Sequence, residues 1–288
     1  MKNYLQMVKK TDSSTSFQHG SLNLDQKNKI VFTSYSKKNF YARAEVSQFV
    51  LRAGHTPINP FMNFDYNLSG VVDKSLIRVA NNTLMAAADE LWVFGDISDG
   101  VLVEIYLAKK QSKLVRYFMI HNSDFQEVDE SSVRLEDVSE WQWEYVRLGK
   151  DLARWHPRLR FHKTYPLIYP AYSKRNFYLQ MHISKYCLEN HVVPLNPFML
   201  FRYFIGDSVS RDTIYRANNN IVRIADEVWV FDEVSDGVLA EIKLKKDRGH
   251  AVKYFRHASD SFPITYRKAS SLQVQFEDAK LEEYRNLL

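Results

Sequence analysis

The residues best suited to chemistry in this sequence are two glutamates, Glu104 and Glu241, which occupy equivalent places in two similar segments. Glu104 follows Gly100 by four residues, and Glu241 follows Gly237 by the same spacing. Four residues are about one helical turn, so each carboxylate is expected to overlook the turn before its helix. A carboxylate held there could attack the anomeric carbon of a sugar or stabilise an oxocarbenium-like transition state.

The turn before each glutamate has the sequence Ser-Asp-Gly. Backbone N–H groups at such a turn, together with the start of the following helix, favour anionic or oxygen-rich ligands. The candidate binding residues are Ser98, Asp99, Gly100, Ser235, Asp236 and Gly237. An alternative interpretation is that the serine or aspartate only caps the helix and that Glu104 lies on the surface.

Both segments belong to an internal repeat in which equivalent positions differ by a constant offset in residue number, 241 − 104 = 137. The offset relates residues 35–41 to 172–178, 59–62 to 196–199, and 115–118 to 252–255. An unbroken offset keeps the helices, turns and strands of the two copies at equal lengths. Two copies of this length indicate a duplicated domain, because solenoid repeats are shorter and more numerous.

Each copy alternates short apolar strands with amphipathic helices. In the first copy we predict strands at 30–34, 56–60, 91–94 and 114–119, and helices at 39–53, 73–88 and 100–110. Gly54 is placed to end the first of these helices. This alternation predicts an α/β protein of two tandem flavodoxin-like, or Rossmann-like, three-layer domains with parallel sheets, related by a pseudo-twofold axis.

The predicted domains follow from the limits of the repeat. They are a flexible N-terminal segment at 1–28, a first domain at 29–128, a helical linker at 129–163, a second domain at 164–270 and a C-terminal helix at 271–288. The linker helix is placed on the tryptophan-rich stretch that contains Trp141, Trp143 and Trp155.

Composition narrows the class of protein. A chain of 288 residues with 45% hydrophobic residues can bury a sizeable core and form two domains. The net charge of +5 results from 39 basic and 34 acidic residues, so we expect a solvated surface rather than a nucleic-acid-binding face. The single cysteine, Cys187, and the lack of a signal-peptide core predict a cytoplasmic protein. No apolar run reaches the roughly 20 residues of a membrane span.

Metals and cofactors are not indicated. The nine histidines lack the spacing of metal ligands. The sequence contains neither a Walker-type loop nor a GxGxxG fingerprint, so no cofactor is predicted.

The run Ala-Asp-Glu-Leu-Trp-Val-Phe, followed by Ser-Asp-Gly and a helical glutamate, resembles the nucleoside 2-deoxyribosyltransferase-like superfamily, which includes nucleotide N-glycosidases. The resemblance covers the layout of nearly all of each copy. It implies that Glu104 and Glu241 are nucleophiles and that the Ser-Asp pairs before them line the sugar pocket. Proteins of this superfamily commonly work as dimers, so the duplication implies an intramolecular pseudo-dimer. Further assembly into homo-oligomers stays open.

Two departures from the superfamily pattern bear on activity. Asn81 and Asn218 stand where an aspartate is usual, and an amide can hydrogen-bond a sugar or base but cannot act as a general acid. The loop after the first strand lacks its usual glycine, which weakens the expectation of a phosphate site. Tyr35 and Tyr172 in this loop either contact the ligand or pack within the loop.

Two functions of different classes follow. The first is an N-glycosidase or 2-deoxyribosyltransferase-like enzyme whose glutamate acts at C1′ of a nucleoside or nucleotide. The second is a non-catalytic nucleotide-ligand binding or sensor protein with the same fold. Both glutamates favour the enzyme, whereas Asn81 and Asn218 favour the binding protein. Direct binding of nucleic acid ranks last, because only the mild positive charge supports it.

Overall fold

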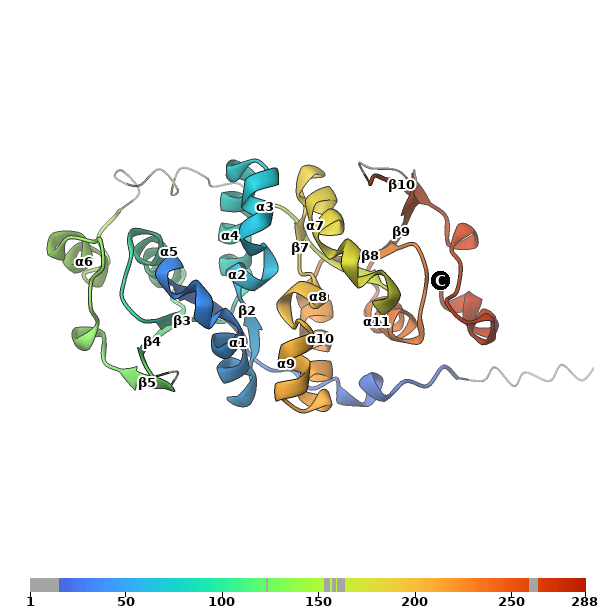
Figure 1. Ribbon diagram of the computed structural model, residues 1–288, viewed down its shortest axis with the longest axis horizontal. Helices are drawn as coiled ribbons and strands as arrows, with labels where there is room; N and C mark the ends of the chain where they lie inside the picture. The colour runs from blue at the N-terminus through green and yellow to red at the C-terminus, as the bar shows by residue number, and fades with distance from the viewer. Residues whose placement is uncertain (1–15, 123, 153–155, 157–158, 160–163, 259–263) are drawn as a thin grey trace, which may run out of the picture.

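The structure is a computed structural model that describes residues 16–122, 124–152, 156, 159, 164–258 and 264–288. Two α/β halves lie side by side, and each contains one sheet (Figure 1). Helices from both halves meet at the centre of the molecule, and the sheets lie to either side of them.

The first sheet has five strands in the order β2-β1-β3-β4-β5. The first four are parallel, and β5 pairs antiparallel with β4 at the edge. The strands are β1 (Ile30–Tyr35), β2 (Thr56–Ile58), β3 (Glu90–Phe94), β4 (Leu114–His121) and β5 (Asp124–Val128). Every residue of β1 and β3 is buried, as is typical of central parallel strands that helices cover on both faces.

The second sheet repeats this arrangement in the order β10-β9-β8-β6-β7, again with one antiparallel edge strand. Its strands are β6 (Leu167–Tyr172), β7 (Val193–Pro194), β8 (Glu227–Phe231), β9 (Val252–His257) and β10 (Tyr266–Ala269). The order of the parallel strands is flavodoxin-like, which confirms the predicted tandem α/β fold. The edge strands β5 and β10 were not predicted, because their mostly polar, half-exposed residues carry no apolar pattern.

The helices of the two halves correspond one to one from α1 to α5. The first half has α1 (Arg43–Arg52), α2 (Pro60–Asn63), α3 (Asp65–Val71), α4 (Lys74–Ala87), α5 (Asp99–Lys110) and α6 (Glu140–Arg147). The second half has α7 (Gln180–Glu189), α8 (Pro197–Leu200), α9 (Tyr203–Ser208), α10 (Arg211–Ile224) and α11 (Asp236–Lys246). The helix predicted at 39–53 is divided into a 3-10 segment, η2 (Lys37–Ala42), and α1. Gly54 follows at φ +81°, as its helix-ending place requires.

The segments outside the two sheets are short helices. The 3-10 helix η1 (Gly20–Leu24) precedes β1, and α6 lies within the predicted linker, whose Trp155 falls outside the described residues. The predicted C-terminal helix consists of the 3-10 helices η6 (Ser271–Gln273) and η7 (Ala279–Leu287). Among the described residues, no helix is long and apolar enough to cross a membrane.

Each sheet is covered on two faces, which makes three layers. Val46 and Val50 of α1 pack on one face of the first sheet with Trp92 and Phe94. Ile183 and Cys187 of α7 do the same on the second sheet. On the opposite faces, α4, α5, α10 and α11 contribute to one apolar core that continues from one half into the other. The duplicated domains therefore share a core and do not merely touch.

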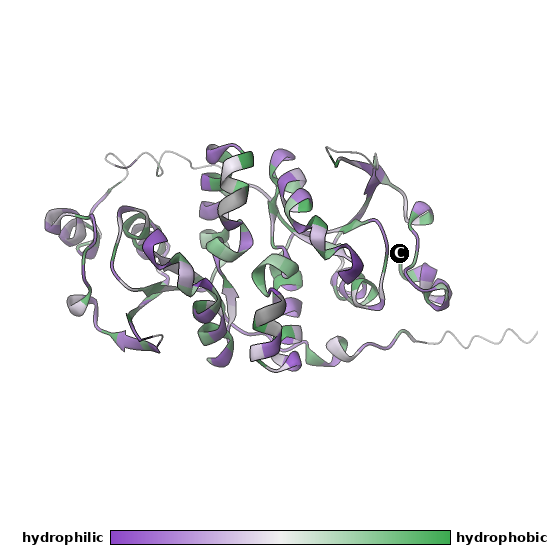
Figure 2. Cartoon of the chain, in the orientation of Figure 1, coloured by the Kyte–Doolittle hydropathy of each residue, from purple (hydrophilic) through white to green (hydrophobic). Residues whose placement is uncertain are grey.

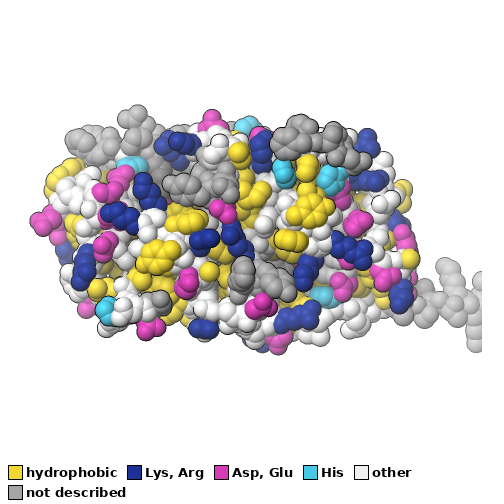
Figure 3. Space-filling view, viewed as in Figure 1, with side chains coloured by type: hydrophobic (Ala, Val, Ile, Leu, Met, Phe, Trp, Pro, Cys, Tyr) yellow, Lys and Arg dark blue, Asp and Glu magenta, His cyan; other side chains and the backbone are white. Residues whose placement is uncertain are grey.

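The two halves meet around a pseudo-twofold axis. Helix α2 packs against its equivalent α8, and the contact of α10 with β2 is repeated by α4 with β7. Apolar residues of α2 and α8 are visible where the halves meet (Figure 2). Asp65 forms an ion pair with Arg202, the residue at the equivalent position of the second half. Basic and acidic side chains are interspersed over the face seen in Figure 3.

Candidate functional site

A cleft of about 410 Å³ opens at the carboxyl ends of β1 and β3, where the order of strands reverses. Helices α2, α4 and α5 supply its walls. All six site residues predicted for the first half line it: Tyr35, Asn81, Ser98, Asp99, Gly100 and Glu104. Tertiary folding thus brings together residues that the sequence spreads over about 70 positions.

Glu104 lies at the inner end of this cleft, in the second turn of α5. Its side chain is buried, with 7% of its surface exposed. The hydroxyl of Ser34 donates a hydrogen bond to Oε2 at 2.5 Å, and Nδ2 of Asn81 donates to Oε1 at 3.3 Å. The alternative that Glu104 is a surface residue is therefore wrong. Strand β1 and helix α4 hold the carboxylate in one orientation.

Two further polar atoms of the cleft lack a hydrogen-bond partner among the described residues. Within the described part of the chain, the Thr33 hydroxyl and the Oδ1 atom of Asn81 are buried and accept or donate no hydrogen bond. Both residues line the cleft. Buried polar atoms are nearly always hydrogen-bonded in native proteins, so these two point to a polar ligand.

The Ser-Asp-Gly turn starts α5 without using its serine as a cap. Ser98 occupies the N-cap position but makes no capping hydrogen bond. The backbone N–H of Asp99 instead donates to Oδ1 of Asp137 at 2.7 Å. Oδ2 of the Asp99 side chain lies 2.7 Å from Nε2 of His156. In the second half, Ser235 does cap α11 by accepting a bond from the N–H of Val238. The capping interpretation thus holds for Ser235 and not for Ser98.

Tyr35 and Tyr172 are buried at the carboxyl ends of β1 and β6 and not in loops. Tyr35 is 4% exposed and donates to Oδ1 of Asn59 at 2.9 Å, and Tyr172 donates to Asn196 at 2.8 Å. Burial raises the pKa of both phenols, so neither ionises near neutral pH. Asn59 also caps α2 by accepting a bond from the N–H of Phe61. The ring of Tyr35 forms a wall of the cleft.

Glu241 occupies the equivalent place in the second half but has different neighbours. Its Oε1 accepts hydrogen bonds from the hydroxyl of Tyr169 and from Nδ2 of Asn218, the latter at 3.0 Å. Desolvation by burial raises the pKa of Glu241 to about 7, although both hydrogen bonds lower it. The carboxyl of Glu241 therefore holds its proton to a much higher pH than an exposed glutamate does.

The hydroxyl that contacts the glutamate comes from a different position in each half. Tyr169 is equivalent to Phe32 of the first half, and Ala171 is equivalent to Ser34. Positions 32 and 34 lie on the same face of β1, because side chains alternate along a strand. Compared with the first half, the second half lacks a hydroxyl at position 171 and has one at position 169, two residues earlier, so each glutamate has one hydroxyl donor. Neither Ser34 nor Tyr169 was predicted, because aligning the two copies shows that these positions differ but not that they contact the glutamates.

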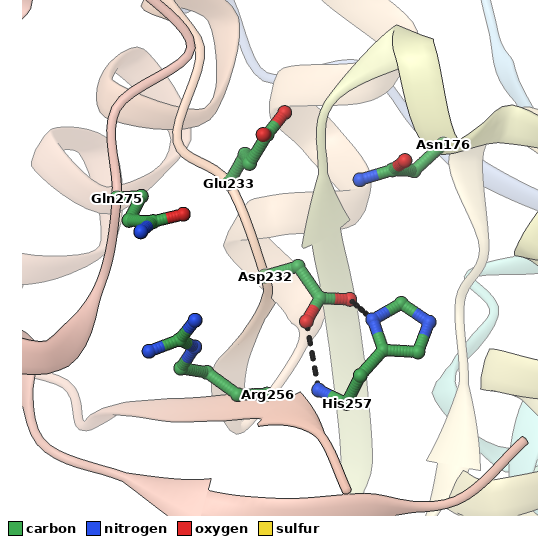
Figure 4. A pocket seen from close by; sticks show the side chains of 6 residues that line it. All are labelled: Asn176, Asp232, Glu233, Arg256, His257 and Gln275. Carbon is green, nitrogen blue, oxygen red and sulfur yellow. Dashed lines mark hydrogen bonds and ion pairs between the residues drawn. The ribbon is translucent and has the colours of Figure 1, made fainter. Parts of the chain in front are cut away.

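The second half also has a polar pocket away from its glutamate (Figure 4). The pocket has a volume of about 280 Å³ and lies beyond the ends of β8 and β9. Asp232 accepts a bond from the N–H of His257 at 2.8 Å, and its other oxygen lies 2.6 Å from Nδ1 of that ring. Arg256 and Glu233 complete the charged lining. The equivalents of Asp232 and His257 are Gly95 and Ile120, so the first half has no counterpart of this aspartate–histidine pair.

The predicted binding residues of the second half have separate partners. Asn218 contacts Glu241, as described above. Gly237 donates its N–H to Oδ1 of Asp236, whose other oxygen lies 4.0 Å from Nε2 of His19. Among the described residues, no three histidine, cysteine or acidic side chains are grouped so that they could hold a metal ion.

Comparison with known protein families detects the same repeat. The family model described as "Domain of unknown function (DUF7768)" matches residues 31–118 and again residues 169–255. Each matched stretch runs from β1 to β4 or from β6 to β9, and so contains the strand, turn and glutamate of its half. No curated protein matches the chain.

Proposed function

The chain belongs to the family described as Domain of unknown function (DUF7768), in two copies, and we propose that it cleaves or transfers N-glycosidic bonds of nucleosides. The observation that carries this proposal is the placement of Glu104. It is buried at the inner end of a cleft whose volume of about 410 Å³ suits a small ligand. Two fixed donors orient its carboxylate, which leaves it well placed to act on a bound sugar.

The polar atoms of the cleft suit a sugar. Oδ1 of Asn81 and the carboxylates of Asp99 and Glu104 are hydrogen-bond acceptors, and the hydroxyl of Thr33 can donate or accept. Sugar hydroxyls supply the donors that such a set requires. The apolar walls contributed by Pro60 and Phe61 suit the flat face of a base.

The charges around the cleft favour a nucleoside over a nucleotide. Five acidic residues line it, and the only lining cation among the described residues is Lys37. Burial raises the pKa of Glu136, but the hydrogen bonds from Ser36 and Lys38 outweigh it, so Glu136 is ionised at neutral pH. Asp65 is paired with Arg202 and Glu136 with Lys38. The remaining acidic residues still outnumber Lys37, so the rim disfavours a phosphate.

The reaction would proceed by covalent catalysis. An oxygen of Glu104 attacks C1′, the bond from C1′ to the base nitrogen breaks, and the departing base keeps the electron pair and takes a proton from water. Attack of water on C1′ then frees the carboxylate, or a second base takes the sugar. Because Asn81 cannot donate a proton as an acid would, the reaction is expected to be fastest with bases that leave readily.

A second candidate function is binding without turnover. Asn81 and Asn218 each donate a hydrogen bond to the glutamate of their own half. An ionisable side chain at these positions could have served as an acid, but an amide cannot. A nucleoside sensor would need the amide hydrogen bonds but no acid.

Release of free base separates these functions. Purified protein is incubated with ribo- and deoxyribonucleosides, their 5′-monophosphates and NAD, and free base is measured by chromatography. We expect release from nucleosides, a fall of about 10³-fold or more in Glu104→Gln, and no effect of the exposed control Glu127→Gln. The Glu241→Gln variant and the double variant show how much the second half contributes.

The result can refute either function. Base release that survives in the double variant would exclude the glutamates as nucleophiles. An absence of release, together with thermal stabilisation of the protein by a nucleoside, would support the binding protein.

A further inference from the structure

The internal repeat extends upstream of each first strand, where it includes two histidines. His19 precedes β1 and His156 precedes β6, and they are related by the same offset as the two glutamates, 156 − 19 = 137. We call residues 16–29 the first arm, and His156, Leu159 and residues 164–166 the second arm. Neither histidine belongs to the lining of the candidate cleft.

Each arm packs on the opposite half of the molecule. The N–H of Asn28, in the first arm, donates to Oδ1 of Asn220 in α10 at 3.1 Å. The N–H of Tyr165, in the second arm, donates to the hydroxyl of Thr83 in α4 at 3.2 Å. Asn28 is equivalent to Tyr165, and Thr83 is equivalent to Asn220. Equivalent residues thus form the same hydrogen bond twice, once from the first arm to the second half and once from the second arm to the first half.

The first arm is the more fully described of the two. Its 3-10 helix η1 packs against α10 and α11 of the second half. Nδ2 of Asn219 donates to the carbonyl of Ser21 at 2.7 Å, and Arg223 forms an ion pair with Asp25 at 2.7 Å. These contacts fix the arm along the helix that also carries Asn218.

Each arm brings its histidine to the aspartate that starts the glutamate-bearing helix of the other half. Nε2 of His156 lies 2.7 Å from Oδ2 of Asp99, and Nε2 of His19 lies 4.0 Å from Oδ2 of Asp236. Both imidazoles are mostly buried, with side chains 19% and 16% exposed. The ring of His19 is further held by its contacts with Phe17 and Tyr215.

We propose that the first candidate site is composite, with His156 of the second arm positioning Asp99. Asp99 lines the cleft that contains Glu104. A carboxylate bonded to an imidazole through Oδ2 has a defined orientation and presents Oδ1 to the hydroxyl groups of a sugar. His156 is a positioning residue, since it acts through Asp99. His19 lies near Asp236 in the same crosswise manner, but its Nε2 is 4.0 Å from Oδ2, which is beyond hydrogen-bond distance. The crosswise arrangement of the arms does not depend on the proposed function, whereas the effect on turnover does.

The positioning role is tested against a histidine outside the site. Base release from a nucleoside is measured in a Glu241→Gln background, in which only the first site can act. There His156→Ala is expected to lower kcat about tenfold, while the exposed control His250→Ala leaves it unchanged. His156→Gln, which keeps a donor, is expected to restore most of the activity, which a merely structural role would not predict.

Hydrogen–deuterium exchange tests the arms without any assay of activity. His156→Ala should speed exchange in the first turns of α5, and His19→Ala in those of α11, in the full-length protein. The exposed His250→Ala serves as the control. Faster exchange in the helix of the same half, or in neither helix, would overturn the proposal.

The two measurements distinguish this proposal from the proposed function. Crosswise exchange together with unchanged turnover in His156→Ala would refute the positioning role in an active enzyme. If the wild-type protein releases no base, the proposed function fails, and crosswise exchange still supports the composite architecture.

Discussion

Among the single residues, the two glutamates show how one chemical group can be kept in different surroundings. Glu104 is bonded by the aliphatic hydroxyl of Ser34, and Glu241 by the phenol of Tyr169. The phenol of Tyr169 is also 2.9 Å from Oδ1 of Asn218, although it has a single proton to donate. Ionised Glu241 accepts from Tyr169 and so competes with Asn218 for that proton. Protonation of Glu241 removes the competition, because the carboxyl can then donate to Tyr169 while Tyr169 donates to Asn218. This agrees with the raised pKa of Glu241.

The raised pKa of Glu241 predicts that stability depends on pH. Its ordinary pKa of 4.5 applies to the unfolded chain and a pKa of about 7 to the folded chain, so between these values the folded state binds more protons. The free energy of unfolding should therefore fall as pH rises from 4.5 to 7. Glu241→Gln removes this term and should be more stable than wild type at pH 8 by up to about 3 kcal/mol, but not at pH 4.

Urea unfolding of both proteins at pH 4, 6 and 8 measures this difference. Glu104→Gln is unfolded in parallel, so that the general effect of replacing a buried carboxylate by an amide is known. An equal difference between wild type and Glu241→Gln at all three values of pH would contradict the prediction.

Among the helices and strands, a lysine binds the last carbonyl groups of α4 in the first half and of α10 in the second, but from a different position in each half. Lys113 donates to the carbonyls of Ala86 and Ala88 at the end of α4, and Lys245 donates to Val222 and Ala225 at the end of α10. The two lysines are not at equivalent positions, yet both satisfy carbonyls that a helix end leaves unpaired. Burial lowers the pKa of Lys245 to about 8.

The turn after the central strand β3 depends on a glycine, which leads to a prediction. Gly95 has φ +74°, and a Cβ atom there would lie 2.6 Å from Nδ2 of Asn39. Gly95→Ala should lower the free energy of unfolding by about 1–3 kcal/mol, from the left-handed backbone and the displaced asparagine. Gly249 has the same φ of +74° but open space around it, so Gly249→Ala measures the backbone cost alone.

Chemical denaturation of both variants tests this account. Gly95→Ala should lose more stability than Gly249→Ala, because only the former also displaces a neighbour. Equal losses would show that Asn39 moves aside freely.

In the molecule as a whole, the two duplicated domains form a single structural unit. The halves share a core, exchange their arms and meet at α2 and α8. At the pseudo-twofold axis the equivalent residues Asp65 and Arg202 form an ion pair whose side chains are 19% and 27% exposed. A symmetric pair of chains would place two identical charges there, so the opposite charges favour pairing of the first half with the second.

The ion pair predicts that reversing the charge of Asp65 alone destabilises the protein, whereas reversing both Asp65 and Arg202 does not. Asp65→Arg would bring two arginines together and should lower the free energy of unfolding by about 2–4 kcal/mol. The double variant Asp65→Arg/Arg202→Asp should recover most of this loss, as a double-mutant cycle would show. Reversing Glu189, in the exposed pair with Lys185, should change stability by less than about 1 kcal/mol. Failure of the double variant to recover would mean that the ion pair does not link the halves.

The duplication, the parallel strands, the three longer helices of each half and the place of each glutamate one turn after Ser-Asp-Gly follow from the amino-acid sequence alone, whereas the short helices α2, α3, α8 and α9 were not predicted. The predicted features depend on close neighbours along the chain, and the constant offset between the two copies supports them by repetition. Strong apolar patterns identified β1 and β3, whereas the polar edge strands β5 and β10 were missed because pairing and not hydrophobicity forms them.

The groups that surround the glutamates, in contrast, are known only from the folded molecule. Ser34 and Glu104 are 70 residues apart, and His156 reaches Asp99 over 57 residues from the opposite half. Such contacts depend on how strands and helices pack, and residue spacing carries no record of them. The hydroxyl donors illustrate this. The first half uses Ser34, and the second half uses Tyr169, whose equivalent in the first half is Phe32. Two positions on the same face of a strand can therefore supply the same contact, although the residue types at each position differ.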